Sequence, residues 1–235
     1  MHVDGDDWLE LNALKALYER QQETGADVVV GSFNRHYEKK IVPCIFSSYE
    51  ITERKCMIAD FLLYSCKNVW GKLYRSSLFT SIEQPAHLVY GEDAIVNVQI
   101  FSSEKCNKAA FINNIVYNYN CSSGGISQGR ICSKVKVINY IDSYVFIRDF
   151  LIEKNYFNFS IKKYFYQYIY SSVFLKAFFS MTKRDAIVQI RKAKFPFIYF
   201  SFQTKIIFYN ILHILFLINA QAYKTIISCY SKMRF

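Results

Sequence analysis

The stretch VDGDDWLELNALKALYERQQETGADVVVGSF (residues 3–33) places an acidic loop, an amphipathic segment and an apolar segment in immediate succession. Apolar side chains recur at roughly helical spacing from Trp8, so we expect a helix that begins there, capped by the preceding aspartates and ended by Gly25. Residues 26–33 are β-branched and continuously apolar at their centre, which is typical of a buried strand. The stretch therefore predicts an α/β fold.

Helical and strand patterns continue to alternate downstream. The further elements that we expect are a helix over 51–65, a short strand or turn over 69–74, a helix over 92–102 and a strand over 109–119. Interleaved helices and strands predict a mixed α/β domain over residues 1–128. The Ser-Ser-Gly-Gly segment at 122–125 marks the boundary to a second part, residues 129–235.

Composition and charge distinguish the two parts. Residues 1–128 carry 12 Lys and Arg against 15 Asp and Glu, whereas residues 129–235 carry 17 against 4. This asymmetry indicates that the second part meets an anionic partner, either a membrane surface or a nucleic acid. With 52% hydrophobic residues, 8 Gly and 3 Pro in 235 residues, the chain is neither disordered nor collagen-like.

The seven cysteines form no Cys-x-x-Cys pair, and no histidine lies near them at ligand spacing. A metal–thiolate site and a disulfide framework are therefore disfavoured, and we expect reduced thiols in a cytoplasmic protein.

Two acidic clusters carry candidate chemistry. Asp4 and Asp6 lie where a short apolar strand gives way to a loop, and hard divalent cations share such oxygen ligands with substrate phosphates. Glu92 and Asp93 lie at an expected helix start, where one positioned carboxylate can act as a general base. Each cluster alone is explained as well by helix capping and the helix dipole.

Five blocks, taken together and in this order, resemble the family 2 glycosyltransferases of the bacterial cell-surface polysaccharide type. The blocks are Val-Asp-Gly-Asp-Asp-Trp-Leu (3–9), Ala-Asp-Val-Val (26–29), Gly-Lys-Leu-Tyr-Arg (71–75), Gly-Glu-Asp (91–93) and Val-Tyr-Asn-Tyr (116–119). Residues 123–127 are also similar to the short loop that follows the Tyr-rich strand in that family. The resemblance covers roughly residues 1–128. It implies a nucleotide-binding α/β domain of the GT-A type that transfers a sugar, with inversion, from a nucleoside-diphosphate donor, expected to be UDP-linked.

The resemblance also implies roles for individual residues on the donor side. Asp4 would lie near the ribose, and Asp6 would hold a Mg²⁺ or Mn²⁺ ion on the diphosphate.

On the acceptor side, the resemblance implies that Asp93 deprotonates the acceptor hydroxyl and that Glu92 supports it. Trp70 and Lys72 would line the acceptor-facing cleft. The alternatives for these two are a core tryptophan and a solvated charge at a strand end.

Members of this family begin with a nucleobase-binding segment of alternating strands and helices, whereas the Asp-x-Asp block begins here at residue 4. We therefore expect an N-terminally truncated GT-A core, which is inactive alone if that segment is missing. Two functions remain open: an inverting glycosyltransferase that acts on a glycan or lipid-linked acceptor in cell-surface polysaccharide synthesis, and a non-catalytic, membrane-associated remnant of such an enzyme.

The second part, residues 129–235, is expected to be a mainly helical, basic extension rich in aromatic residues. Helical periodicity is found over 134–154, 159–181 and 197–227. Lysines interleaved with Tyr and Phe favour the inner membrane surface, and nucleic acid is the less favoured partner. The uncharged run 206–223 is interrupted by polar residues, so a spanning, an in-plane and a buried helix all stay open. We expect peripheral attachment at the cytoplasmic face.

Overall fold

The computed structural model describes residues 1–63, 67–121, 133–199 and 204–232. The chain divides into two compact units. Unit 1 comprises Met1–Pro85 with Glu92–Gln128, and unit 2 comprises Ala86–Gly91 with Gly129–Phe235. Unit 1 is a mixed α/β body, which confirms the expected fold class, and the regular elements described in unit 2 are helices.

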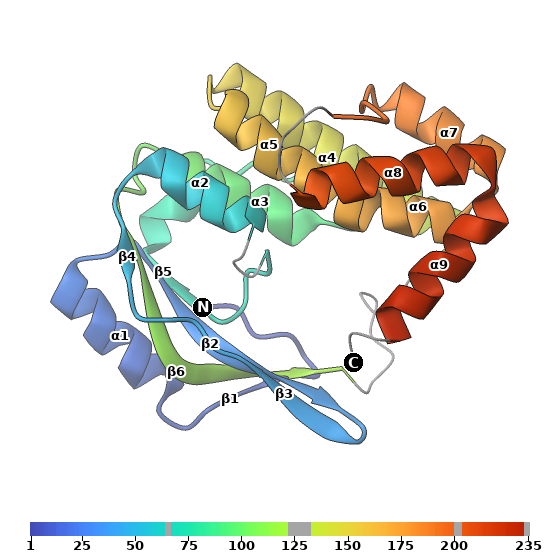
Figure 1. The fold of residues 1–235 in the computed structure, drawn as a ribbon. Helices are drawn as coiled ribbons and strands as arrows, with labels where there is room; N and C mark the ends of the chain where they lie inside the picture. Colours follow the sequence, from blue (N-terminus) through green and yellow to red (C-terminus); the bar gives the residue numbers. More distant parts are fainter. Residues whose placement is uncertain (64–66, 122–132, 200–203, 233–235) are drawn as a thin grey trace. The chain divides into compact units, whose positions relative to one another are not determined.

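A six-stranded sheet forms the centre of unit 1 (Figure 1). Its strands are β1 (Trp8–Leu9), β2 (Val28–Tyr37), β3 (Lys40–Cys44), β4 (Glu50–Ile51), β5 (Lys72–Tyr74) and β6 (Ala109–Asn120). The two long strands, β2 and β6, run parallel to each other. Strands β3 and β5 pair antiparallel with β2, and β1 and β4 pair antiparallel with β6. The carboxyl ends of the two long strands therefore lie at the same end of the sheet.

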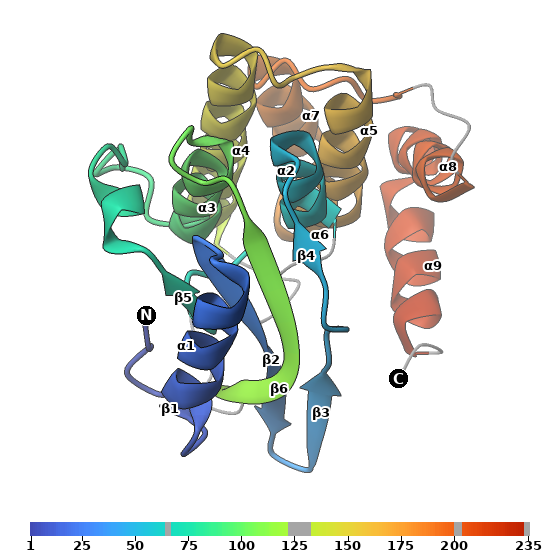
Figure 2. The same ribbon diagram turned by 90° about the vertical axis from the view of Figure 1, so that its left-hand side faces the viewer.

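The helical elements described in unit 1 are α1 (Ala13–Thr24), α2 (Arg54–Leu63), the 3₁₀ turn η1 (Ser76–Phe79) and α3 (Glu92–Ser102). Helix α1 packs on β6 and β2 (Figure 2). Helices α2 and α3 pack against each other, and α3 is buried from Ala94 to its end. The core of unit 1 thus has α1 against the long strands and a separate pair of helices.

The helix expected from Trp8 begins instead at Ala13. Trp8 and Leu9 form β1, because their backbone pairs with β6. Neither preceding aspartate caps α1, and the Asp7 carboxylate instead accepts hydrogen bonds from β6. Gly25 ends α1 as predicted, with φ +67 in the left-handed region that glycine adopts without strain. Long-range pairing therefore overrides the local helical pattern at residues 8–12.

The other elements expected in unit 1 are confirmed in type. The expected elements at 26–33, 69–74, 92–102 and 109–119 correspond to β2, β5, α3 and β6. The helix expected over 51–65 corresponds to α2, and residues 64–65 lie outside the described ranges, as do the loop segments 122–125 and 123–127. Strands β3 and β4 are not predicted by the sequence, since both are short and depend on pairing with β2 or β6.

Unit 2 is built from helices that bury aromatic side chains. Its described helical elements are α4 (Lys134–Glu153), α5 (Phe159–Tyr168), the π-helical segment η2 (Ile169–Phe174), α6 (Leu175–Ser180), α7 (Lys183–Lys192), α8 (Thr204–Ile218) and α9 (Ala220–Lys232). The helices expected over 134–154 and 159–181 are confirmed as α4 and the continuous run from α5 to α6. Helix α7 is not predicted by the sequence.

The long helix expected over 197–227 is divided. Residues 197–199 are not helical, and Asn219 interrupts the helix between α8 and α9. The Asn219 side-chain oxygen accepts the backbone N–H groups of Gln221 and Ala222, at 3.1 and 3.0 Å, and so caps α9. In the part of the chain that the structure describes, no helix combines the length and apolar character needed to cross a bilayer.

Candidate functional site

The acidic loop at residues 3–7 is attached to the carboxyl-terminal half of β6. The Tyr117 hydroxyl accepts the Asp4 backbone N–H at 3.0 Å and donates to the Asp7 carboxylate at 2.7 Å. The Asp7 carboxylate also accepts the Asn120 backbone N–H at 2.7 Å. Ligand sites of open α/β sheets lie beyond the carboxyl ends of the strands. The two candidate donor-side aspartates therefore lie at the end of the sheet where a substrate is expected.

Trp70 lies in the core beneath this loop, with 3% of its surface exposed. Its ring stacks on Tyr117, with centroids 4.4 Å apart and planes within 7°, and on Tyr119 at 5.3 Å. Phe33 contacts the ring edge-on at 5.0 Å, and His2 forms a parallel backbone bridge with Trp70. The surroundings of Trp70 are those of a core tryptophan, which was the alternative to a residue that lines the acceptor-facing cleft. Its contacts link the acidic loop to the sheet.

Asp93 lies at the start of α3, half-buried, with its pKa raised to about 6. Burial is the largest cause, followed by the charge of Glu92, and Asp4 raises the pKa further. A hydrogen bond from the Val69 backbone amide and the charge of Lys72 act in the opposite direction. The structure therefore brings Asp4, Lys72 and Glu92 within electrostatic reach of Asp93.

Lys72 is fully buried at the start of β5, so the alternative of a solvated strand-end charge is wrong. Its Nζ donates a hydrogen bond to the Asn68 backbone carbonyl. Because Lys72 is buried, water weakly screens the attraction between its positive charge and the Asp93 carboxylate. Lys72 lies beside the candidate base.

Asn97 of α3 supports this arrangement and has no role in the sequence-based prediction. Its side-chain nitrogen donates to the backbone carbonyls of Lys67, Asn68 and Asp93, at 2.9, 3.1 and 3.0 Å. Its side-chain oxygen accepts the Tyr74 hydroxyl at 2.9 Å. The signal in the sequence is a polar residue inside the apolar run of residues 94–101, where a buried amide needs partners.

Tyr117 is the second residue that the sequence-based prediction leaves without a role. It belongs to the Val-Tyr-Asn-Tyr block, but nothing in that block indicates that its hydroxyl holds both Asp4 and Asp7. The ring is fully buried, and burial raises the pKa of its hydroxyl, which therefore stays protonated and can donate to Asp7.

Asp4 and Asp6 are both exposed. Partial burial raises the pKa of Asp4, and the charges of Asp7 and Asp6 raise it further, while His2 lowers it. Among the described residues, no group of three or more His, Cys, Asp or Glu side chains forms a ready-made metal cage. A Mg²⁺ ion typically takes only one or two carboxylates and completes its shell with substrate phosphates and water. Asp4 and Asp6 fit that kind of site, because a cation relieves their mutual repulsion.

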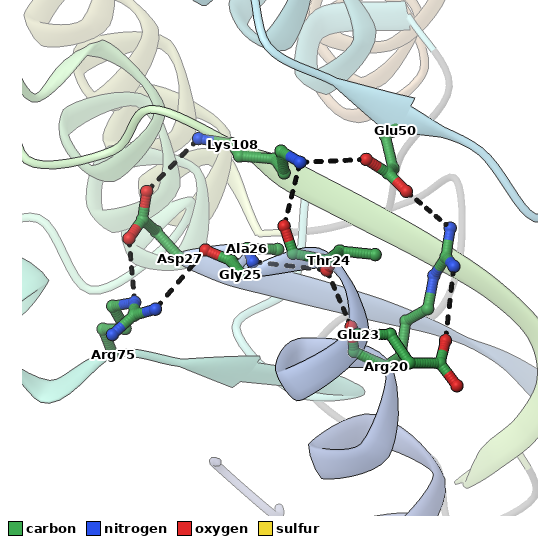
Figure 3. A network of polar contacts seen from close by, with 9 residues as sticks. All are labelled: Arg20, Glu23, Thr24, Gly25, Ala26, Asp27, Glu50, Arg75 and Lys108. Atoms are coloured by element: carbon green, nitrogen blue, oxygen red, sulfur yellow. Dashed lines mark hydrogen bonds and ion pairs between the residues drawn. The ribbon is translucent and has the colours of Figure 1, made fainter.

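A second polar network lies at the opposite, amino-terminal end of β2 (Figure 3). Asp27 accepts the backbone N–H groups of Asn107 and Lys108, at 2.8 and 3.2 Å, and pairs with Arg75 at 2.9 Å. The Lys108 ammonium group pairs with Glu50 at 3.1 Å. These contacts link the ends of strands β2, β4, β5 and β6. The network therefore has a structural role and is separate from the candidate site.

Comparison with known proteins finds no matching family model. Over 142 residues the chain is 27% identical to the glycosyltransferase GlyA of Streptococcus pneumoniae, covering 54% of this chain and 19% of that protein. Over 132 residues it is 27% identical to the cholesterol galactosyltransferase of Borreliella burgdorferi, covering 50% of this chain and 36% of that protein. The chain thus has glycosyltransferase homologues, and it spans about a fifth and about a third of their lengths.

Solved structures share the fold at lower identity. S. aureus TarS matches with a TM-score of 0.54 and 16% identity, over 81% of this chain and 32% of TarS. The TarS 1–349 structure in complex with UDP-GlcNAc matches with a TM-score of 0.50 and 14% identity, over 95% of this chain and 66% of that one. The fold of this chain is therefore similar to that of TarS.

Proposed function

We propose that this protein is an inverting family 2 glycosyltransferase of the GT-A type. It moves a sugar from a nucleoside-diphosphate donor, UDP-linked, to a glycan or lipid-linked acceptor in cell-surface polysaccharide synthesis. The observation that carries the proposal is the convergence on Asp93, whose pKa is raised, of the charges of Glu92, Lys72 and Asp4. The similarity to glycosyltransferases over half of the chain supports it independently.

In this mechanism Asp93 is the general base. It takes the proton of the acceptor hydroxyl while the hydroxyl oxygen bonds to the anomeric carbon from the face opposite the leaving group. The bond from that carbon to the diphosphate oxygen breaks, and its electron pair leaves with the nucleoside diphosphate. A base with a pKa of about 6 is mostly ionised at neutral pH and still holds a proton better than an ordinary aspartate. Glu92 supports the acceptor side, and Trp70 and Lys72 lie on that side, where the charge of Lys72 favours the ionised form of Asp93.

On the donor side, Asp4 would lie near the ribose and Asp6 would hold a Mg²⁺ or Mn²⁺ ion, which when bound would supply positive charge to offset the charge developing on the leaving diphosphate. The fit rests on two exposed carboxylates in a loop that Tyr117 holds in place.

The test is a calorimetric titration of the full chain with UDP, and then with GDP, in the presence of Mn²⁺. We expect saturable, metal-dependent binding of UDP that Asp6→Ala abolishes. The matched control is Asp149→Ala, which removes the same charge from an exposed position on α4 of unit 2 and should leave the titration unchanged. Binding that survives Asp6→Ala would contradict the assigned metal ligand.

The same titration decides between this proposal and the alternative, a non-catalytic, membrane-associated relative of these enzymes. A folded chain that binds neither nucleotide would favour the non-catalytic alternative. In either case we propose that the basic helical part attaches the protein peripherally to the cytoplasmic face of the membrane. The charge of residues 129–235 supports this, with 17 Lys and Arg against 4 Asp and Glu.

A further inference from the structure

Helix α8 of unit 2 exposes an apolar stripe. Every exposed side chain that the structure describes on this helix is isoleucine or phenylalanine: Ile207, Phe208, Ile211, Ile214 and Ile218. Four of the five, 207, 211, 214 and 218, repeat at spacings of three and four residues, which places them on one face of the helix. We call these five residues the α8 stripe.

The orientation of α8 is set by its opposite face. Leu212, His213 and Phe216 are buried in unit 2. The His213 ring packs against Tyr170, Phe174 and Phe178, with centroid distances of 4.7, 4.9 and 5.4 Å. The Phe216 ring stacks on Phe178 at 3.8 Å. The α8 stripe is therefore the face of the helix that unit 2 leaves exposed. The opposite face of α8 already packs into the core of unit 2.

Helix α7 of the same unit shows how a water-facing helix of this chain is composed. Its exposed residues are Arg184, Val188, Arg191 and Lys192, three cations and one valine. A contiguous apolar face of the kind seen on α8 is uncommon on soluble surfaces and marks an interaction site. The contrast indicates that α8 meets a partner less polar than water.

Charge identifies the chemistry of that partner. The last acidic residue of the chain is Asp185, and residues 186–235 carry seven Lys and Arg with no Asp or Glu. A second copy of the same surface would bring like charge against like charge, whereas an anionic bilayer offers both an apolar interior and negative headgroups. The buried imidazole of His213 and the 15-residue length of α8 suit a helix that lies in the membrane surface rather than across it.

We propose that the α8 stripe inserts into the surface of an anionic lipid bilayer, with the cations of residues 186–235 against the headgroups. This interaction does not depend on sugar transfer and holds for either function considered above.

The test is flotation of the full chain with phosphatidylcholine vesicles, with and without about 30% phosphatidylglycerol. The stripe variant is Ile211→Gln/Ile214→Gln/Ile218→Gln, which keeps helix propensity because Gln favours helices at least as well as Ile. The matched control is Val135→Gln/Ile152→Gln, which removes exposed apolar side chains from α4 of the same unit. Circular dichroism and thermal unfolding check that each variant is folded.

We expect the wild-type chain to float with anionic vesicles and the stripe variant to lose affinity by about tenfold or more. The control should bind like the wild type, and high salt should weaken binding of both. The proposal is overturned if the wild type does not float with anionic vesicles, or if the stripe variant binds them as well as the wild type does. It is also overturned if ultracentrifugation shows a wild-type dimer that the stripe variant dissociates, since the face would then join two copies.

Discussion

At the scale of single residues, Asp93 is a half-buried carboxyl group whose pKa is raised. Its pKa is raised from 3.8 to about 6, mainly because burial disfavours the charged form. The folded state therefore holds the Asp93 proton more tightly than the unfolded state does. Above pH 6 the folded protein carries the full cost of this buried charge, and the cost fades as the pH falls toward 4.

Replacement Asp93→Asn should reveal that cost. The amide keeps an oxygen that can accept the Val69 N–H but carries no charge, so at pH 7.5 the variant should be more stable than the wild type, by roughly 3 kcal/mol at most. Near pH 4 the difference should disappear. Urea unfolding of both proteins at the two pH values measures it, and a difference that does not change with pH would contradict the raised pKa.

If Asp93 is the general base proposed above, the same variant should lose sugar transfer by about 10²–10⁴-fold while its affinity for the donor is kept. In the wild type, transfer should rise with pH through about 6 as Asp93 ionises.

Tyr117 offers a second test at the residue scale. Tyr117→Phe keeps the ring that stacks on Trp70 but removes the hydroxyl that bonds to Asp4 and Asp7. We expect a loss of about 1–2 kcal/mol in stability and weaker binding of UDP with Mn²⁺, since the acidic loop is no longer held.

Tyr49→Phe is the matched control for this test. The Tyr49 ring stacks on Phe111, and its hydroxyl donates to Asp60 at 3.1 Å, away from the candidate site. It should cost about 1 kcal/mol in urea unfolding and leave the titration unchanged. If both variants weakened nucleotide binding equally, a specific role for Tyr117 would be excluded.

At the scale of elements, unit 1 depends on the close approach of β2 and β6. A Cβ atom on Gly31 of β2 would lie 2.3 Å from Cγ2 of Val116 and 2.8 Å from its Cγ1. The register of the two strands shifts next to this point, between Gly31 and Ser32. Glycine is required here because the neighbouring strand fills the space of its side chain.

Gly31→Ala should therefore destabilise the protein by about 1–3 kcal/mol through overpacking. Adding Val116→Ala should recover part of that loss, because the two changes relieve each other and are not additive. Gly5→Ala, where a Cβ meets nothing within 4 Å, is the control. Urea unfolding of these variants and of Val116→Ala alone measures the effect, and strictly additive losses of the two single variants in the double variant would show that the contact does not limit the packing.

At the scale of the whole molecule, the chain combines two units of opposite charge. The acidic part, residues 1–128, has 15 Asp and Glu against 12 Lys and Arg, and it contains the residues of the candidate site. The basic part, residues 129–235, has the aromatic helices and the α8 stripe. Under the function and the membrane attachment proposed above, the first part would carry catalysis and the second part would attach the protein to the membrane.

The sequence by itself determined the alternation of helices and strands, the C-terminal end of α1, both ends of α3, and the two acidic clusters. These depend on local patterns: a left-handed glycine at residue 25, apolar runs with strand or helix periodicity, and the charge balance of each part. The candidate carboxylates could be named in advance because short motifs carry them.

Only the tertiary structure decided which residues act on those carboxylates. Trp8 and Leu9 joined the sheet rather than a helix because β6 offered them a pairing partner more than 100 residues away. Lys72 was buried beside Asp93, and Tyr117 and Asn97 became supports, because their surroundings come from segments distant in sequence. Burial and hydrogen bonding depend on what the folded chain brings together, and local sequence patterns do not contain that information.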